Sequence, residues 1–195
     1  APVFFGVLSI FSCVVMATEK PTYTSEVFKV KSTSRSVEKP VIAMIAIPLK
    51  VHGPLPVIIT QHGSSRDGVV FTGGEGRTDE YSTRLIREGT KRGFAVVAID
   101  AFYKTRIKPV DKGKFPNAIQ YALDLKEILA MDARFDRVNI FYTGFSYGAS
   151  QVNNSVDIRE DFKSMPWRAT AAAEPGCNVI SEPVQVAFPI MLIKG

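Results

Sequence analysis

Cysteine is scarce in this chain, because only Cys13 and Cys177 occur among its 195 residues. Cys13 lies in an apolar amino-terminal stretch that we predict to be removed, which leaves Cys177 without a partner in the same chain. An intrachain disulfide is therefore excluded as a source of stability in the mature protein. Apolar residues make up 46% of the sequence and charged residues 22%, a composition typical of one globular domain with a sizeable core.

Clusters of one charge are missing as well. The chain has 24 basic and 19 acidic residues and a formal net charge of +5, but the basic residues are scattered and do not alternate with a stripe of aromatic residues. Nucleic-acid binding is therefore not supported. The segment Gly73-Gly74-Glu75-Gly76 lacks the Lys-Ser/Thr pair of a phosphate-binding loop, which argues against a nucleotide site there.

A run long enough to span a membrane is absent too. The apolar stretch at residues 3–17 precedes the first charged residue, Glu19, and is shorter than the ~20 residues of a membrane-spanning helix. Small residues at Val15 and Ala17 fit a signal-peptide cleavage site after Ala17, so we predict an amino-terminally incomplete signal peptide at 1–17, a linker at 18–25 and export to the periplasm or the medium. The alternatives are a lipid anchor on Cys13 and an uncleaved anchor or buried helix.

The most informative feature is the motif Gly144-Phe145-Ser146-Tyr147-Gly148, which directly follows the β-branched apolar run at 138–142 and precedes a predicted helix. A G-x-S-x-G pattern in that setting places the serine at the apex of a sharp strand-to-helix turn, in a strained conformation that exposes its Oγ. Gly144 and Gly148 are required because side chains would collide there. Since the pattern arises by chance in roughly 7 of 100 chains of this length, its strand and helix context carries the argument. We predict Ser146 to be a catalytic nucleophile.

A second motif lies upstream, where the apolar strand 55–61 runs into His62-Gly63-Ser64-Ser65. Acyl transfer builds negative charge on the former carbonyl oxygen, and two backbone N–H groups stabilise it, one from such a loop and one from the residue after the nucleophile. We assign these oxyanion donors to Ser64 and Tyr147. Without the serine motif, His62-Gly63 would indicate only an ordinary strand end. His62 precedes the serine, whereas the catalytic histidine of such enzymes follows it, so we expect His62 to shape the loop.

Strand and helix patterns alternate along the chain. We predict helices at 78–91, at 116–131 and after Ser146, and a glycine-rich loop at 68–76. Strands are predicted at 27–31, 41–47, 55–61, 93–99, 138–142, 168–173 and 188–193. The alternation predicts an α/β fold, with a mainly parallel sheet that is flanked by helices and connected by right-handed crossovers.

These features together resemble the dienelactone hydrolase-like family of the α/β-hydrolases, over residues 26–195. The resemblance is carried by five stretches, which are His62-Gly63-Ser64-Ser65, the strand from Gly93 to Asp100 with Ala101-Phe102, Asp136-Arg137-Val138, Gly144-Phe145-Ser146-Tyr147-Gly148 and Pro175-Gly176-Cys177. It implies an α/β-hydrolase fold and a nucleophile at Ser146. The family's namesake enzymes have cysteine at that position, so serine points to ordinary ester hydrolysis.

The chain also departs from this family. Glu174 stands where relatives often have tyrosine. The family places its catalytic acid just after the strand that Pro189 to Ile193 resembles and its histidine further on, and neither position exists in these residues. A serine needs a base, and the base needs an orienting carboxylate. We therefore expect a fragment whose last helices and strand are missing and which is nearly inactive and poorly stable alone. A naturally short, non-catalytic relative is the alternative.

Other polar residues receive lesser roles. Glu174, at a strand end, is expected to be structural or to face substrate rather than to orient a histidine. Asp100 is expected to cap a loop, Cys177 to be a packed thiol, and His52 to be solvated in the turn before the strand at 55–61.

The sequence thus predicts an exported serine hydrolase that acts on small carboxylic esters through an acyl-enzyme on Ser146, with no metal and no organic cofactor implied. A serine peptidase of the same fold is the first alternative. A binding protein that keeps the fold without the chemistry is the second.

Overall fold

The computed structural model describes residues 22–30, 41–65, 70–72, 75–102, 118–156, 167–176, 186 and 188–195. Its helices are α1 (Glu80–Lys91), α2 (Ala118–Met131) and α3 (Tyr147–Asn154). Its strands are β1 (Tyr23–Val30), β2 (Val41–Pro48), β3 (Leu55–Gln61), β4 (Val70–Thr72), β5 (Glu75–Arg77), β6 (Ala95–Asp100), β7 (Phe135–Phe145), β8 (Thr170–Ala173) and β9 (Ile190–Ile193). The predicted signal peptide at 1–17, with Cys13, and the residue Cys177 lie outside the described residues.

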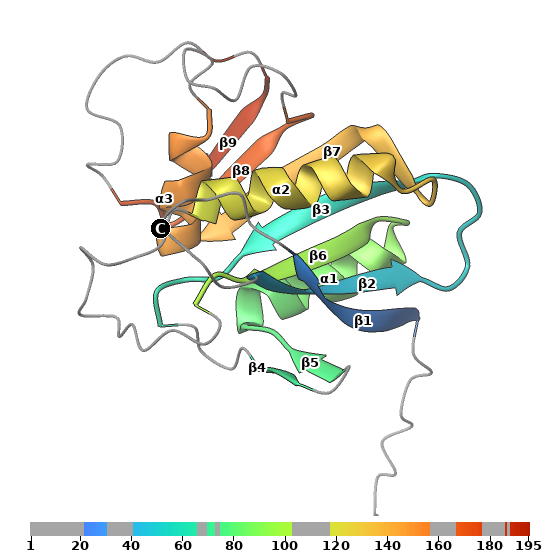
Figure 1. Cartoon of the computed structure of the whole chain (residues 1–195). Coiled ribbons are helices and arrows are strands. Elements are labelled where there is room, and N and C mark those ends of the chain that lie inside the picture. Colours follow the sequence, from blue (N-terminus) through green and yellow to red (C-terminus); the bar gives the residue numbers. More distant parts are fainter. Residues whose placement is uncertain are drawn as a thin grey trace, which may run out of the picture.

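One large sheet organises the fold (Figure 1). Its seven strands run in the order β1-β2-β6-β3-β7-β8-β9, and β4 and β5 form a separate two-stranded sheet. The strands from β6 to β9 in this order pair in parallel, whereas β2 pairs antiparallel with both β1 and β6. The predicted mainly parallel sheet with flanking helices is therefore confirmed.

Helices cover both faces of the central strands (Figure 1). On one face, Ile86 of α1 packs into a cluster with Met44 of β2 and Val96 of β6. On the other face, Leu125 of α2 belongs to a larger cluster that includes Ile59 of β3. All six residues of β6 are buried, as expected for a parallel strand that is covered on both sides.

The edge formed by β8 and β9 is different. Met191, Leu192 and Ile193 of β9 are 60%, 64% and 47% exposed. Beside them, on the α1 side of the sheet, lies an apolar groove of about 560 Å³ that β7, β8 and β9 line together with residues of α1, including Leu85. Nothing in the described part of the chain fills this groove.

Most predicted elements are confirmed, and β3 has the predicted bounds. The first strand begins earlier than predicted, at Tyr23, because β1 pairs with β2 continuously from Tyr23↔Pro48 to Val30↔Val41; residues 23–25 of the predicted linker therefore lie in the strand. The loop predicted at 68–76 is wrong in part, since 70–72 and 75–77 pair as β4 and β5. Backbone pairing decides both cases, and side-chain patterns do not reveal it.

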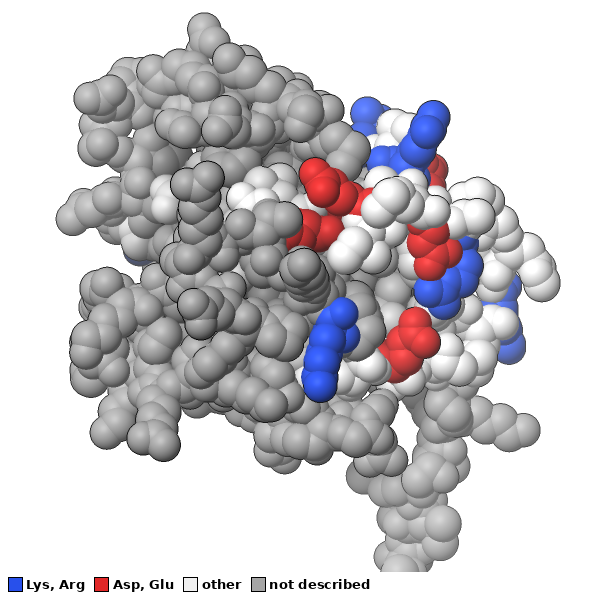
Figure 2. Space-filling model, viewed as in Figure 1, with Lys and Arg blue, Asp and Glu red and all other residues white. Residues whose placement is uncertain are grey.

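The described surface has no large region of one charge on the face in Figure 2, where acidic and basic side chains lie interspersed. No described helix combines the length and the apolar character needed to cross a membrane.

Candidate active site

Ser146 lies between the last residue of β7 and the first residue of α3, with φ 52° and ψ −110°. Among the described residues only Ser146 and Glu174 have a positive φ without being glycine. Such a conformation costs a non-glycine residue on the order of 1–3 kcal/mol and persists only where the surroundings enforce it. The chain therefore contains the strained strand-to-helix turn that the motif predicts.

The two glycines of the motif allow this turn to form. A Cβ on Gly144 would lie 2.4 Å from the backbone carbon of Gly148, and a Cβ on Gly148 would lie 2.3 Å from the backbone oxygen of Gln61. Both contacts are with backbone atoms, which cannot move aside as the end of a long side chain can. Only glycine fits at either position, so β7, α3 and the end of β3 come into direct backbone contact around Ser146.

Hydrogen bonds hold the Ser146 backbone from two sides. Its N–H donates to the carbonyl oxygen of Ala173 at the end of β8 (2.9 Å), and its own carbonyl oxygen accepts from the N–H of Ser150 in α3 (3.0 Å). The strained residue is thus fixed by an adjacent strand and by the helix that it precedes.

His62 lies at the start of the loop after β3 and is 1% exposed. Its Nε2 accepts from the N–H of Ala101 (3.1 Å), so the ring proton is on Nδ1, which donates to the carbonyl oxygen of Gly63 (2.6 Å). Its edge packs on Phe102, with ring centroids 5.1 Å apart. Both nitrogens are engaged by the backbone, so His62 joins this loop to the end of β6, as expected, and neither nitrogen is free to serve Ser146.

Asp100 has the loop-capping role expected of it. Its Oδ1 accepts from the N–H of Phe102 (3.0 Å) and lies 3.7 Å from Nε2 of His62. Because Nε2 accepts a hydrogen bond from the N–H of Ala101, it does not donate one to Asp100.

The loop predicted to supply an oxyanion donor borders the serine. A Cβ on Gly63 would lie 3.5 Å from the Cβ of Ser146 and 3.3 Å from Cδ1 of Phe145. On the other side of the serine, Tyr147 is the first residue of α3, so its N–H has no acceptor within the helix. The ring of Tyr147 is buried and lies 5.3 Å from that of Phe102. Ser64 follows Gly63 directly, so the segments of both assigned donors flank Ser146.

The remaining candidate residues lie apart from this chemistry. His52 is exposed in the turn before β3. Because β3 and β7 are parallel, this turn lies at the amino-terminal ends of these strands, whereas Ser146 lies at their carboxy-terminal ends. Glu174 has φ 55°, and its Oε1 accepts from the N–H of Gly195 (2.7 Å). Its carboxylate therefore has a structural contact after β9, which is the first of the two roles expected of it.

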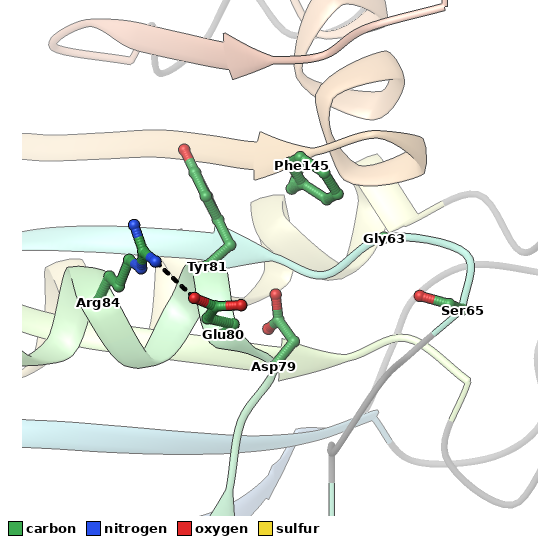
Figure 3. A pocket seen from close by; sticks show the side chains of 7 residues that line it. All are labelled: Gly63, Ser65, Asp79, Glu80, Tyr81, Arg84 and Phe145. Atoms are coloured by element: carbon green, nitrogen blue, oxygen red, sulfur yellow. Dashed lines mark hydrogen bonds and ion pairs between the residues drawn. The ribbon is translucent and has the colours of Figure 1, made fainter.

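A cavity of about 400 Å³ opens beside the loop, and its walls include Asp79, which sequence reasoning missed (Figure 3). Tyr81 and Phe145 form aromatic walls. The Tyr81 hydroxyl donates to Oγ1 of Thr143 (2.6 Å), which in turn donates to the carbonyl oxygen of Ala171 (2.8 Å). Burial raises the pKa of Tyr81 more than this hydrogen bond lowers it, so the hydroxyl stays protonated. Asp79 fell inside the helix predicted at 78–91, whereas the structure begins α1 at Glu80 with Asp79 as its N-cap, so nothing in the sequence indicated a cavity there.

Metal ligands are not grouped in this region or elsewhere in the described residues, where no cluster of three or more His, Cys, Asp or Glu could hold an ion.

The strand order, the strained serine turn and the adjoining loop define the α/β-hydrolase fold, and comparison with solved structures shows the same. A Pyrobaculum calidifontis esterase is 20% identical with a TM-score of 0.58, over 85% of this chain and 48% of that one. A Klebsiella pneumoniae protein designated a dienelactone hydrolase is 16% identical with a TM-score of 0.54, over 78% of this chain and 60% of that one. A Pyrococcus horikoshii acylaminoacyl peptidase is 19% identical with a TM-score of 0.55, over 80% of this chain and 24% of that one.

The expected resemblance to dienelactone hydrolase-like α/β-hydrolases is thus confirmed at the level of the fold. No protein-family model matches the sequence, and neither does any curated protein. The chain spans less than two thirds of the length of each of these structural relatives.

Proposed function

We propose that the protein is a serine hydrolase that cleaves carboxylic esters with Ser146 as its nucleophile. The observation that carries the proposal is the positive φ of Ser146, enforced by close backbone contacts at Gly144 and Gly148. A strained non-glycine residue lowers stability, and glycine at position 146 would avoid the strain. A serine there is explained by a need for its hydroxyl.

The proposed reaction follows from the elements around the serine. Oγ of Ser146 attacks the ester carbonyl carbon, the bond to the alcohol breaks, and water then hydrolyses the acyl-enzyme. The N–H groups of Ser64 and Tyr147 stabilise the negative charge on the carbonyl oxygen in each step. The proton of Oγ passes to a base and from it to the departing alcohol.

The base is the part of this mechanism that the sequence does not provide. The chain contains two histidines. His52 lies at the opposite ends of the strands from Ser146. Both ring nitrogens of His62 form hydrogen bonds with the backbone. We therefore propose that the catalytic histidine and its carboxylate come from polypeptide other than these 195 residues, and that the 195 residues alone hydrolyse esters poorly.

Labelling with a fluorophosphonate and hydrolysis of 4-nitrophenyl esters by the full-length polypeptide test the proposal. Ser146→Ala is expected to abolish labelling and to lower kcat by more than about 10³-fold. Ser25→Ala, a change of the same kind on the exposed side of β1, is the control and is expected to change neither. Unchanged hydrolysis by Ser146→Ala would show that Ser146 is not the nucleophile, and an intact fold that never labels would favour a binding protein.

A serine peptidase is the second candidate, favoured by the structural likeness to the Pyrococcus horikoshii acylaminoacyl peptidase. Comparing kcat/KM for an ester and the matching anilide of the same acyl group separates the two. A ratio above about 10³ in favour of the ester supports the esterase, whereas comparable values support the peptidase.

The proposal also includes export. The mature protein is expected to begin at Thr18, which mass spectrometry of the protein recovered outside the cytoplasm would test. An intact 1–17 segment or a lipid on Cys13 would contradict cleavage at this site.

A further inference from the structure

The Asp79 carboxylate has no hydrogen-bond or ion-pair partner among the described residues. The residue is 8% exposed, and its Oδ1 is buried without a hydrogen-bond partner. Asp79 is the N-cap of α1, yet its side chain makes no capping hydrogen bond. Aspartate at this position usually accepts a hydrogen bond from an N–H of the first turn. The Asp79 carboxylate does not form this capping bond.

The carboxylate points into the cavity instead (Figure 3). Burial of a carboxylate without a partner costs free energy, and buried charges in proteins are normally paired. The positive end of the α1 dipole offsets part of this cost, but it provides no hydrogen-bond donor here. An unpaired carboxylate on the wall of a cavity is therefore suited to a ligand that brings the missing positive charge.

The other charges of the cavity wall do not provide it. Arg84 is paired with Glu80 through Nη2 and Oε1 (2.5 Å), and both side chains lie largely in solvent. The described wall thus has two carboxylates and one guanidinium, and the guanidinium belongs to Glu80. The remaining carboxylate of the described wall is that of Asp79.

Aromatic rings complete the setting. Tyr81 and Phe145 both line the cavity, and their ring centroids lie 5.8 Å apart with planes inclined by 32°. The hydrogen bond from Tyr81 to Thr143 fixes the phenol ring. Ring faces attract ammonium groups by about 0.5–2 kcal/mol, so the rings and the Asp79 carboxylate favour the same kind of ligand.

The cavity adjoins the proposed nucleophile. Gly63 and Phe145 line it, and a Cβ on Gly63 would lie 3.5 Å from the Cβ of Ser146. We propose that Asp79, with Tyr81 and Phe145, binds an ammonium group of the substrate, so that the enzyme selects esters that carry a primary amine. This inference rests on the proposed function, because it places the ammonium group and the reacting carbonyl in one molecule.

Binding of n-hexylammonium to the full-length Ser146→Ala protein, measured by calorimetry against n-hexanol, tests the subsite without catalysis. Hexylammonium is expected to bind at least tenfold more tightly than hexanol, and Asp79→Asn is expected to remove this difference. The Asp79 side chain makes no capping hydrogen bond that asparagine could lose, so the variant should fold. Glu88→Gln is the matched control, since it removes one negative charge from the same helix at a residue that does not line the cavity, and it should leave the difference unchanged.

Ester pairs then test selection. 4-Nitrophenyl 3-aminopropanoate is compared with the butanoate, and the 6-aminohexanoate with the heptanoate, so that each pair has matched length. A preference of about tenfold in kcat/KM for the ammonium ester of either pair, lost in Asp79→Asn while hydrolysis of the neutral ester stays within twofold, supports the proposal.

Two results overturn the inference: hexylammonium binding that Asp79→Asn does not weaken, or a loss of hydrolysis in Asp79→Asn that is equal for charged and neutral esters. Failure of the proposed function gives a different result, because Ser146 would then not label and no ester would be hydrolysed, while calorimetry would still report on the subsite.

Discussion

Strands β6 and β9 have similar apolar sequences, Ala-Val-Val-Ala-Ile-Asp and Ile-Met-Leu-Ile, but opposite environments. Every residue of β6 is buried, whereas Met191 and Leu192 of β9 are more than half exposed. An apolar run therefore predicts a strand but not what covers it. The cover of β6 comes from its neighbouring strands and from helices on both faces, which the run itself does not encode.

The boundary between the two regions passes through β7 and β8. Their α2 side is covered, with Tyr142 stacked on Trp167 at 4.9 Å, while their α1 side borders the open groove with Phe141 and Ala171. Ser146 lies at this boundary, because β7 leads into it and the end of β8 holds its N–H. The proposed catalytic residue thus depends on both the well-packed centre and the exposed edge.

The largest effect that separates the two regions is expected for Gly148→Ala at the centre. The new Cβ would meet the backbone oxygen of Gln61 at 2.3 Å, so the free energy of unfolding should fall by about 3 kcal/mol or more, measured by denaturant titration. Gly53→Ala is the control, since it has φ +95° but no atom within 4 Å, and it should cost about 1–2 kcal/mol. Equal losses would show that crowding at the serine turn is unimportant.

Truncation of isoleucine compares the centre and the edge directly. Ile59 of β3 is fully buried, whereas Ile193 of β9 is 47% exposed. Ile59→Ala should lower the free energy of unfolding by about 2–5 kcal/mol, and Ile193→Ala by less than about 1 kcal/mol. Thermal and chemical denaturation measure both. A large loss at Ile193 would mean that further polypeptide or a partner buries the β9 edge in solution.

Much of the fold could be predicted because its pattern is local. The apolar run 55–61 ends at a polar loop, so β3 was placed at the observed residues. β4 and β5 could not be predicted, since their pairing joins Val70 to Arg77 across a glycine-rich segment with no alternating pattern. Strand pairing of this kind depends on partners that the sequence does not mark.

The candidate site also contains residues that the sequence predicts and residues that it does not. Ser146 and its glycines form a contiguous motif, and the conformation it requires is the one observed. Asp79 and Tyr81 were missed, because they approach Phe145 only after the loop following β3 and the start of α1 come together in space. Residues that meet only in the folded chain form no motif of fixed spacing in the sequence.

The free energy of unfolding should depend on pH through Lys126, which lies on the side of the sheet that α2 covers. Burial lowers the pKa of Lys126 to about 8, and its Nζ lies 4.5 Å from the centre of the Trp167 ring. Between pH 8 and its ordinary pKa near 10.5 the unfolded chain binds more protons than the folded one, so stability rises with pH. The free energy of unfolding should increase by about 1–2 kcal/mol from pH 8 to 9.5. Lys126→Met should flatten this slope, and an unchanged slope would contradict the assignment.

The smallest effect on stability is expected at the edge itself. The double variant Met191→Lys, Leu192→Lys replaces two exposed side chains, so the free energy of unfolding should change by less than about 0.5 kcal/mol. Aggregation should nevertheless decrease, because charges on an edge strand oppose pairing between molecules. Light scattering at matched concentrations measures this, with Met131→Lys, an exposed methionine on α2, as the control. Equal aggregation of all three proteins would show that β9 is not the site of association.

The hydrogen bond from Ser146 N–H to the carbonyl oxygen of Ala173 couples the serine to β8, which pairs with the exposed strand β9. If β8 opened locally, this bond would break and the constraint on φ of Ser146 would be lost. If Ser146 is the nucleophile, as we propose, its reactive conformation would then depend on the local stability of β8. Hydrogen exchange at the Ser146 amide would therefore report how often the hydrogen bond to Ala173 is open. A contact that stabilises β8 and β9 would slow this exchange and favour the strained conformation of the proposed nucleophile without contacting the substrate.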